Sequence, residues 1–183
     1  MKHVIHTFVI ALIIATSAVT VQAHMPNSLE VGGTELMLNG VGMRQSGLVK
    51  PYQAGLYLAH RTADATAIVS GDEPMALRIE ITSLLVTPKN LEESMHEGFV
   101  KSTNGDLQSI GPEIDQFKKC LPAKVSKGDI FEFNYLPGTG VTVLENGENK
   151  GVVTGMPFKQ ALFGIWLGKE PADANLKRRL LNP

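Results

Sequence analysis

The sequence predicts an α+β fold, in which one antiparallel β-sheet carries a layer of helices on one face. Three observations support this prediction. The elements run in the order strands, two helices, strands, then terminal helices. Apolar residues alternate with a period of two in residues 75–85 and 129–136, whereas they recur every three or four residues between these segments. The helix expected from Met156-Pro157 is apolar almost all round, so it should be buried on most sides.

Residues 1–23 are typical of a secretory signal peptide. Lys2 supplies the positive charge, residues 8–19 are mostly apolar, and Val21-Gln22-Ala23 places small residues at a cleavage site. The apolar run is short for a membrane span, although an uncleaved N-terminal anchor is the alternative. Cleavage near Ala23 would give an exported, periplasmic or secreted protein with no membrane span. Residues 24–183 are long enough for a single domain with its own core.

Composition excludes several classes of function. The formal net charge is −1 and no basic patch is evident, which argues against nucleic acid as a partner. The single cysteine, Cys120, cannot form an intrachain disulfide, and its place in a helical pattern predicts a buried residue without a role. The histidines His24, His60 and His96 lack metal-ligand spacing with Cys, Asp or Glu. We therefore expect no metal and no cofactor.

Arg44 and Tyr52 stand out in a glycine-rich, apolar segment between two expected strands at residues 35–38 and 54–58. The glycines predict a turn or bulge there, and residues 25–33 before it are expected to be irregular. A guanidinium in such a segment needs water or an anion, because burying it alone is prohibitive. It forms either a carboxylate or enolate receptor with the Tyr52 hydroxyl, or a surface arginine on a hairpin. Residue types alone favour the surface arginine.

The remaining elements follow from caps, breakers and periodicity. Thr87 is the expected N-cap of a helix with Pro88 in its first turn. A second helix is expected over residues 106–121, with Gly111-Pro112 kinking or delaying it. Further elements are a short helix or loop at 62–72, a strand at 75–85, a three-stranded meander at 129–136, 141–144 and 150–154, a helix ending at Gly168, and a last helix capped by Asp173.

Two motifs resemble those of the chalcone isomerase superfamily. The run LNGVGMR at residues 38–44, with GLYL at 55–58, resembles the first motif of that superfamily. The run FKQALFGIWLG at 158–168, with Pro171 and Leu176-Lys177, resembles its bacterial, exported branch. The resemblance spans nearly all of the mature chain. It implies an open-faced β-sandwich, with a large antiparallel sheet, a helical layer on one face, and a ligand cleft between them.

The superfamily includes plant enzymes that cyclise chalcones to flavanones and non-catalytic members that bind fatty acids. Arg44 matches the motif arginine that holds the developing anion, while Tyr52 stands at the position of a threonine in the enzymes. The enzymes carry a tyrosine, a lysine and an asparagine on the first long helix, and a substrate-selecting residue near the C-terminus. The corresponding positions here are on or near Leu91, Ser94, Gly98 and Ile165, and the three helix positions do not match.

Three hypotheses follow. The first is an exported, non-catalytic protein that binds a fatty acid or similar apolar carboxylate, with Arg44 and Tyr52 at the head group. The alternative is an isomerase or intramolecular lyase acting on an enone or phenolic, chalcone-like substrate, with Arg44 stabilising the anion. The third is an interaction protein whose cleft is filled by its own side chains, for which the bulky residues 158–167 are the obvious candidates. We rank them in this order.

Overall fold

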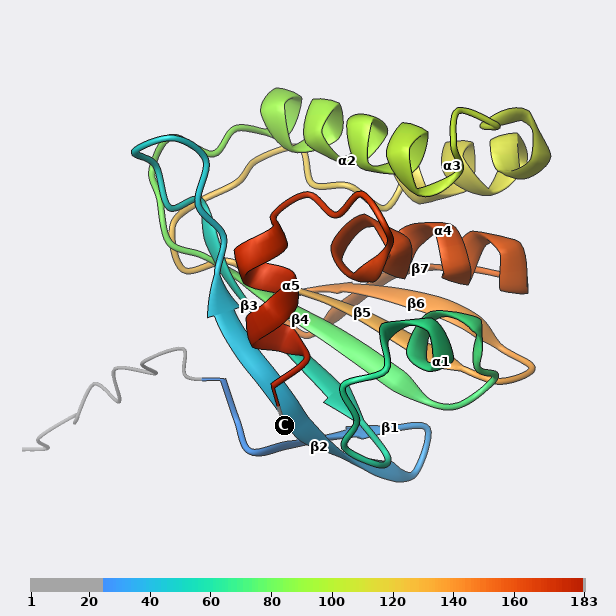
Figure 1. The fold of residues 1–183 in the computed structure, drawn as a ribbon. Coiled ribbons are helices and arrows are strands. Elements are labelled where there is room, and N and C mark those ends of the chain that lie inside the picture. The colour runs from blue at the N-terminus through green and yellow to red at the C-terminus, as the bar shows by residue number, and fades with distance from the viewer. Residues whose placement is uncertain (1–24, 183) are drawn as a thin grey trace, which may run out of the picture.

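A computed structural model describes residues 25–182 of the chain (Figure 1). The predicted signal peptide at 1–23, its cleavage site near Ala23 and the alternative of an N-terminal anchor lie outside these residues. Within 25–182, no helix combines the length and the hydropathy needed to cross a membrane.

The sheet contains seven strands in which every strand is antiparallel to its neighbour in sequence, in the order β1 to β7. The strands are β1 (Ser28–Val31), β2 (Thr34–Met43), β3 (Tyr52–Leu58), β4 (Met75–Ile81), β5 (Ile130–Leu136), β6 (Gly140–Glu145) and β7 (Glu148–Val153). The predicted antiparallel sheet is confirmed, and the three-stranded meander expected at its end is part of a meander that includes the whole sheet.

The first strand corrects one prediction, because residues 28–31 form β1 where an irregular segment was expected. Gly32 and Gly33 join β1 to β2, with φ angles of 57° and 81°, a conformation that suits a two-residue hairpin turn. Strand β2 is also longer than predicted, since Gly40 and Gly42 lie within it. A β-carbon on Gly40 would lie 2.2 Å from the Arg179 carbonyl oxygen, so this glycine allows the last helix to pack directly on the strand.

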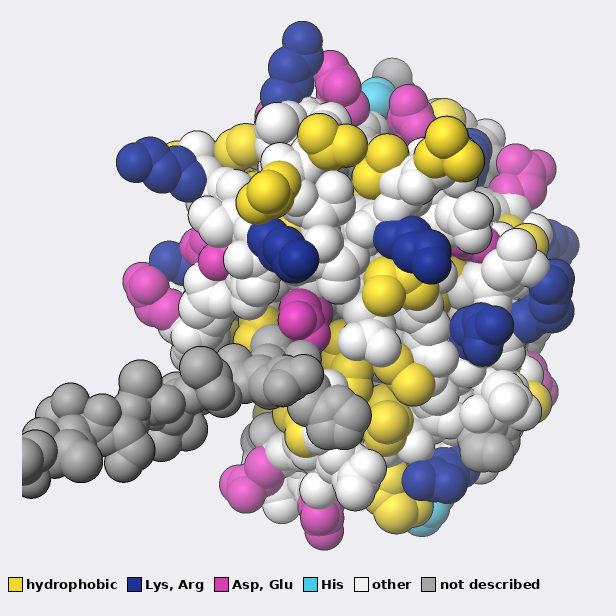
Figure 2. Space-filling model, turned by 90° about the vertical axis from the view of Figure 1, so that its left-hand side faces the viewer, with side chains coloured by type: hydrophobic (Ala, Val, Ile, Leu, Met, Phe, Trp, Pro, Cys, Tyr) yellow, Lys and Arg dark blue, Asp and Glu magenta, His cyan; other side chains and the backbone are white. Residues whose placement is uncertain are grey.

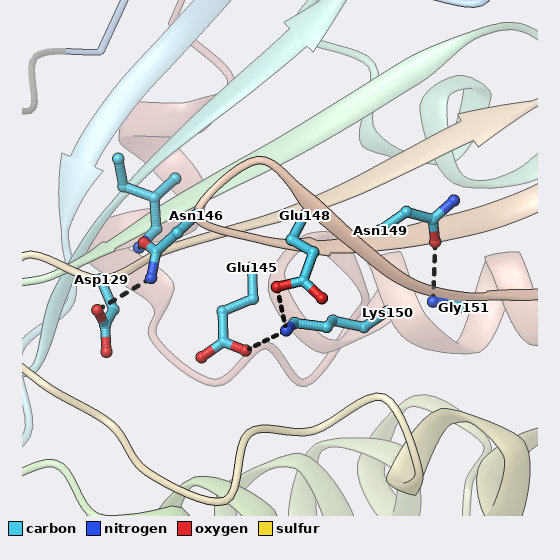
Figure 3. Close-up of polar contacts among 8 residues, drawn as sticks. Asp129, Glu145, Asn146, Glu148, Asn149, Lys150 and Gly151 are labelled. Carbon is cyan, nitrogen blue, oxygen red and sulfur yellow. Dashed lines mark hydrogen bonds and ion pairs between the residues drawn. The ribbon is translucent and has the colours of Figure 1, made fainter.

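The predicted Asn146-Gly147 turn joins β6 to β7. Both residues have positive φ angles, 51° and 82°, as a tight hairpin turn requires. Lys150 bridges the hairpin with ion pairs to Glu145 at 3.3 Å and Glu148 at 2.8 Å (Figure 3). The Asn146 amide donates to Asp129 at 3.1 Å, which connects this turn to the segment preceding β5.

The helices are α1 (Ala65–Ser70), α2 (Pro88–Ser102), the 3₁₀ helix η1 (Gln108–Ile110), α3 (Gly111–Lys118), α4 (Met156–Leu167) and α5 (Ala174–Leu180). Thr87 caps α2 as predicted: its hydroxyl accepts from the Asn90 N–H, and the Asn90 side chain accepts from the Thr87 N–H. Asp173 caps α5. The helix expected over 106–121 begins only at Gly111, after η1, consistent with the predicted delay.

Helix α4 lies between the sheet and the helices α2 and α3, which explains its apolar surface (Figure 1). Helix α2 crosses it closely, because a β-carbon on Gly98 would lie 2.7 Å from Ile165. Phe99, Phe117 and Phe158 pack together at ring-centroid distances of 5.7–5.8 Å. The core is thus a layer of aromatic side chains between sheet and helices.

Lys159 is the exception in this apolar helix, because it is fully buried. Its ammonium group lies 5.2 Å from the centroid of the Tyr135 ring. It donates hydrogen bonds of 2.7–2.8 Å to three carbonyls at the C-terminal end of α1, those of Ile68, Val69 and Gly71. Three N–H donors therefore meet three acceptors, and α1 is fixed on α4 by this side chain.

Candidate ligand-binding site

A cavity of about 360 Å³ lies between the sheet and the helical layer. Its volume falls toward the lower end of the range for small-molecule sites, about 300–1,000 Å³. Most of the wall is apolar, with Ile79, Ile81, Phe131, Phe133 and Val143 from the sheet, Leu91, Ser94 and Met95 from α2, and Ile165 and Trp166 from α4. The structure therefore contains the cleft that the sequence predicted.

The bulky residues of α4 do not fill this space, which removes the basis of the third hypothesis. Among residues 158–167, Ile165 and Trp166 line the cavity. Phe158 instead packs against Phe99 and Phe117 in the core.

Arg44 and Tyr52 lie together at one end of the cavity. They face each other across the β2–β3 hairpin, where the Arg44 N–H donates to the Tyr52 carbonyl at 2.9 Å. The guanidinium carbon of Arg44 lies 5.6 Å from the centroid of the Tyr52 ring, within range of a cation–π interaction. The structure thus brings the two predicted site residues into one polar end of an otherwise apolar cavity.

Trp166 orients the tyrosine, since its indole N–H donates to the Tyr52 hydroxyl at 2.8 Å in the buried wall. This contact occupies a lone pair of the hydroxyl oxygen and leaves its hydrogen free, because no described residue accepts it. Burial raises the pKa of Tyr52, and the positive charge of Arg44 and the hydrogen bond from Trp166 offset only part of that effect. Tyr52 is therefore a neutral hydrogen-bond donor at physiological pH.

Arg44 has unused hydrogen-bonding capacity. Its Nε is buried and has no hydrogen-bond partner among residues 25–182, and the guanidinium forms no ion pair with a carboxylate in that range. A buried guanidinium nitrogen without a partner costs free energy that an acceptor in the cavity would recover. The unpaired Nε–H of Arg44 and the hydroxyl hydrogen of Tyr52 are therefore available to an acceptor in the cavity, which suits an anionic oxygen.

Asp173 supplies a counter-charge near Arg44. Its carboxylate accepts hydrogen bonds from the backbone N–H groups of Gln45, Asn175 and Leu176 at 2.7–3.1 Å. Burial alone would raise the pKa of Asp173, but these hydrogen bonds and the positive charge of Arg44 hold it below its usual value. Asp173 therefore stays ionised, which helps to keep the Arg44 guanidinium half-buried at this end of the cavity.

Sequence reasoning missed the parts that Trp166 and Asp173 play here. Asp173 was predicted only as a helix cap. For Trp166 a general signal exists, because a buried indole N–H needs a hydrogen-bond acceptor. Of the helix positions compared with the enzymes, Leu91 and Ser94 line the cavity, whereas Gly98 packs against Ile165.

Cys120 is buried as predicted, and it contributes to the cavity wall. Burial raises the pKa of its thiol, so the reactive thiolate is disfavoured. Among residues 25–182, no three His, Cys, Asp or Glu side chains cluster in a way that could hold a metal ion.

The family model described as chalcone isomerase-like matches residues 17–182. The chain belongs to the chalcone isomerase-like family. The structure of this family member is similar to the crystal structure of a fatty-acid binding protein of Arabidopsis thaliana, AtFAP1, with a TM-score of 0.68 over 86% of this chain and 91% of that one. The two sequences are 19% identical, so the likeness concerns the fold. No curated protein matches the chain in sequence. The predicted open-faced arrangement of sheet and helices is confirmed.

Proposed function

We propose that this protein binds a fatty acid or a similar apolar carboxylate in the cavity, without catalysing a reaction on it. One observation carries the proposal: among the described residues that line the cavity, Arg44 is the only charged one, and it lies at one end beside the Tyr52 hydroxyl. A ligand with one anionic end and an apolar body matches that arrangement. The similarity of fold to a protein named for fatty-acid binding supports the same class of ligand.

The two parts of such a ligand would contribute differently. Burying a methylene group contributes roughly 0.8 kcal/mol, so eight of them would contribute about 6 kcal/mol. A hydrogen bond to a charged group contributes about 1.5–3 kcal/mol. The alkyl chain would therefore supply most of the affinity, while Arg44 and Tyr52 would select the carboxylate and fix its orientation.

The cavity wall favours binding over isomerase chemistry. An isomerase needs a group that transfers a proton to or from the substrate. The described residues lining the cavity include no Asp, Glu, His or Lys, and burial raises the pKa of both Tyr52 and Cys120. The family positions at Leu91 and Ser94 carry neither the tyrosine nor the lysine of the enzymes.

Arg44→Ala is expected to reduce retention of a co-purifying fatty acid. Native mass spectrometry of the mature protein, with organic extraction of bound material, should find much less ligand in this variant than in the unaltered protein. Affinity for added fatty acid should fall by about tenfold or more, because a charge-assisted contact of about 1.5–3 kcal/mol is lost. Arg44→Lys should lie between the two, since it keeps the charge but not the planar fork.

Arg61→Ala is the matched control, because Arg61 is exposed and does not line the cavity. It should bind fatty acid as the unaltered protein does. The proposal would be wrong if the protein purifies without a ligand and does not bind added fatty acids. It would also be wrong if Arg44→Ala binds fatty acid as well as the unaltered protein does.

We also propose that the protein acts after export, in the periplasm or outside the cell. The support is the signal-like pattern of residues 1–23, with small residues up to Ala23. Expression in a Gram-negative host, followed by N-terminal sequencing of the periplasmic protein, should give a chain that begins at His24. A chain that stays in the membrane fraction with Met1 intact would instead establish the N-terminal anchor.

A further inference from the structure

Exposed leucines surround the same end of the cavity as Arg44 and Tyr52, the residues on either side of the β2–β3 loop. We call this end the mouth; it is formed by residues of the β2–β3 and β4–α2 loops that line the cavity: Ser46, Val49, Pro51, Leu85 and Val86. The exposed fractions of Leu48, Leu84 and Leu85 are 102%, 83% and 65%. Leu85 both lines the cavity and faces solvent, so the apolar surface continues from the cavity to the outside.

These leucines are held outward by ordered loops. Ser46 and Val49 exchange backbone hydrogen bonds of 2.9 and 3.0 Å, which places Leu48 at the tip of a tight turn. The Asn90 side-chain amide donates a hydrogen bond to the Leu85 carbonyl at 3.0 Å. Thr82 joins the two loops, since its hydroxyl donates to the Lys50 carbonyl at 2.8 Å and its N–H donates to the Pro51 carbonyl at 2.9 Å. The exposed leucines therefore belong to one surface.

A third segment, residues 121–129, borders the same surface. It is tied to the end of β4 by hydrogen bonds between the Gly128 N–H and the Ile81 carbonyl, and between the Ile81 N–H and the Asp129 carbonyl. Across residues 45–51, 82–89 and 121–129 the charged residues are four lysines and one aspartate: Lys50, Lys89, Lys124, Lys127 and Asp129. This excess of positive charge contrasts with the formal charge of −1 for the whole chain.

The single acidic residue of these three segments, Asp129, is engaged in hydrogen bonds. The Asp129 carboxylate accepts from the Ser126 N–H at 2.6 Å. It also accepts from the Asn146 amide at 3.1 Å (Figure 3). Lys89 has an exposed pair with Glu93 at 3.8 Å, which contributes little in water. Figure 2 shows the side of the molecule on which these loops lie. Hydrophobic side chains lie across its upper part, with Lys and Arg side chains below and beside them and Asp and Glu side chains at the upper edge and in the centre.

We propose that the mouth docks on the surface of a membrane containing anionic lipids. The leucines insert among the acyl chains near the head groups, and the lysines contact the lipid phosphates. The inference rests on the proposed function: docking would give a fatty acid an apolar path between bilayer and cavity, past Leu85. Pairing of two mouths is disfavoured, because a symmetric contact would bring the lysines of both copies together.

The test is co-flotation of the full mature protein with vesicles of phosphatidylcholine alone and of phosphatidylcholine mixed with phosphatidylglycerol. The protein should float with the anionic vesicles, and less so at high salt. The double variant Leu48→Ser/Leu84→Ser should partition at least about tenfold more weakly, because two exposed side chains lose their apolar groups. Neither residue lines the cavity, so fatty-acid binding should be retained.

Two further variants separate the contribution of the lysines from that of the leucines and control for the loss of any exposed hydrophobic side chain. Lys50→Gln/Lys127→Gln should weaken flotation only with anionic vesicles, by roughly fivefold per lysine. Met37→Ser/Val100→Ser is the matched control, since both residues are exposed hydrophobics outside the three segments, and it should float normally.

The outcomes distinguish this inference from the proposed function. Loss of flotation with retained fatty-acid binding in the leucine variant would support docking. A protein that binds fatty acid but does not float would overturn docking and leave the proposed function intact. Flotation that is unchanged in the leucine variant would also overturn docking. So would a protein that does not bind vesicles but forms a dimer, if the leucine variant is monomeric. If no fatty acid binds but the leucine-dependent flotation is observed, the proposed function fails and the docking surface stands.

Discussion

Lys159→Met is expected to destabilise the protein by about 2–4 kcal/mol, because three carbonyls at the C-terminal end of α1 lose the buried side chain that donates to them. Removing the buried charge acts in the opposite direction on stability, because the free-energy cost of desolvating it disappears. Burial lowers the pKa of Lys159 to about 8, although the charges of Asp72 and Glu73 oppose this effect. The lysine is therefore still mostly protonated at neutral pH, and the loss of three hydrogen bonds should dominate.

Urea unfolding and amide hydrogen exchange would measure this effect. Exchange should accelerate most in α1, while the Trp166 fluorescence of the folded variant, which reports on the opposite end of α4, should change little. Lys118→Met on the exposed surface of α3 is the control, with an expected change within about 0.5 kcal/mol. Equal stability of Lys159→Met and Lys118→Met would show that the buried lysine does not fix α1.

The second large effect is a steep loss of stability above pH 10, caused by the tyrosines. The chain has three, and burial is the largest cause that raises the pKa of Tyr52, Tyr57 and Tyr135, the last to about 12. A tyrosine in the unfolded chain ionises near pH 10, whereas the folded protein keeps the proton to higher pH. The folded state then binds more protons than the unfolded state, so stability falls by roughly 1.4 kcal/mol per pH unit for each tyrosine.

Lys159 acts in the opposite direction at lower pH. Between about pH 8 and about pH 10.4 the unfolded lysine keeps a proton that the folded protein has lost, so its contribution to stability rises with pH. The profile should therefore rise above pH 8 and fall steeply above pH 10, and Lys159→Met should remove the rise.

Absorbance at the tyrosinate band, recorded together with far-ultraviolet circular dichroism, would test the tyrosine prediction. Tyrosinate should appear cooperatively with loss of secondary structure, because none of the three residues ionises freely in the folded protein. A titration centred near pH 10 with native circular dichroism would contradict it. Chemical denaturation at each pH would give the slope.

Much of the fold could be predicted because its signals are local. The cap at Thr87 fixed the start of α2, and the alternation of Phe131, Phe133 and Tyr135 identified β5, where all three side chains are buried. Strand β1 was missed because four residues give too little periodicity, and its stability comes from pairing with β2. The length of β2 depended on α5, which lies against Gly40 and comes from the other end of the chain.

The candidate site also has one part that could be predicted from the sequence and one part that could not. Arg44 and Tyr52 lie on one hairpin, so a short sequence motif was enough to predict that they are neighbours. Their role in binding a head group stays a prediction. Trp166 contacts Tyr52 from 114 residues away, and Asp173 acts on Arg44 from the connection between α4 and α5, so neither contact has a local signal.

The neighbour-to-neighbour order of the strands also has a consequence for how the molecule folds. Each strand pairs with the one that precedes it, and most of these pairings join strands close in sequence, which favours rapid folding. The exception is the pairing of β4 with β5, which are separated by residues 82–129. The polar end of the cavity instead needs Arg44 and Tyr52 to meet residues near the C-terminus. The proposed binding site is therefore complete only when α4 and α5 are docked, and a ligand bound there would stabilise this long-range docking.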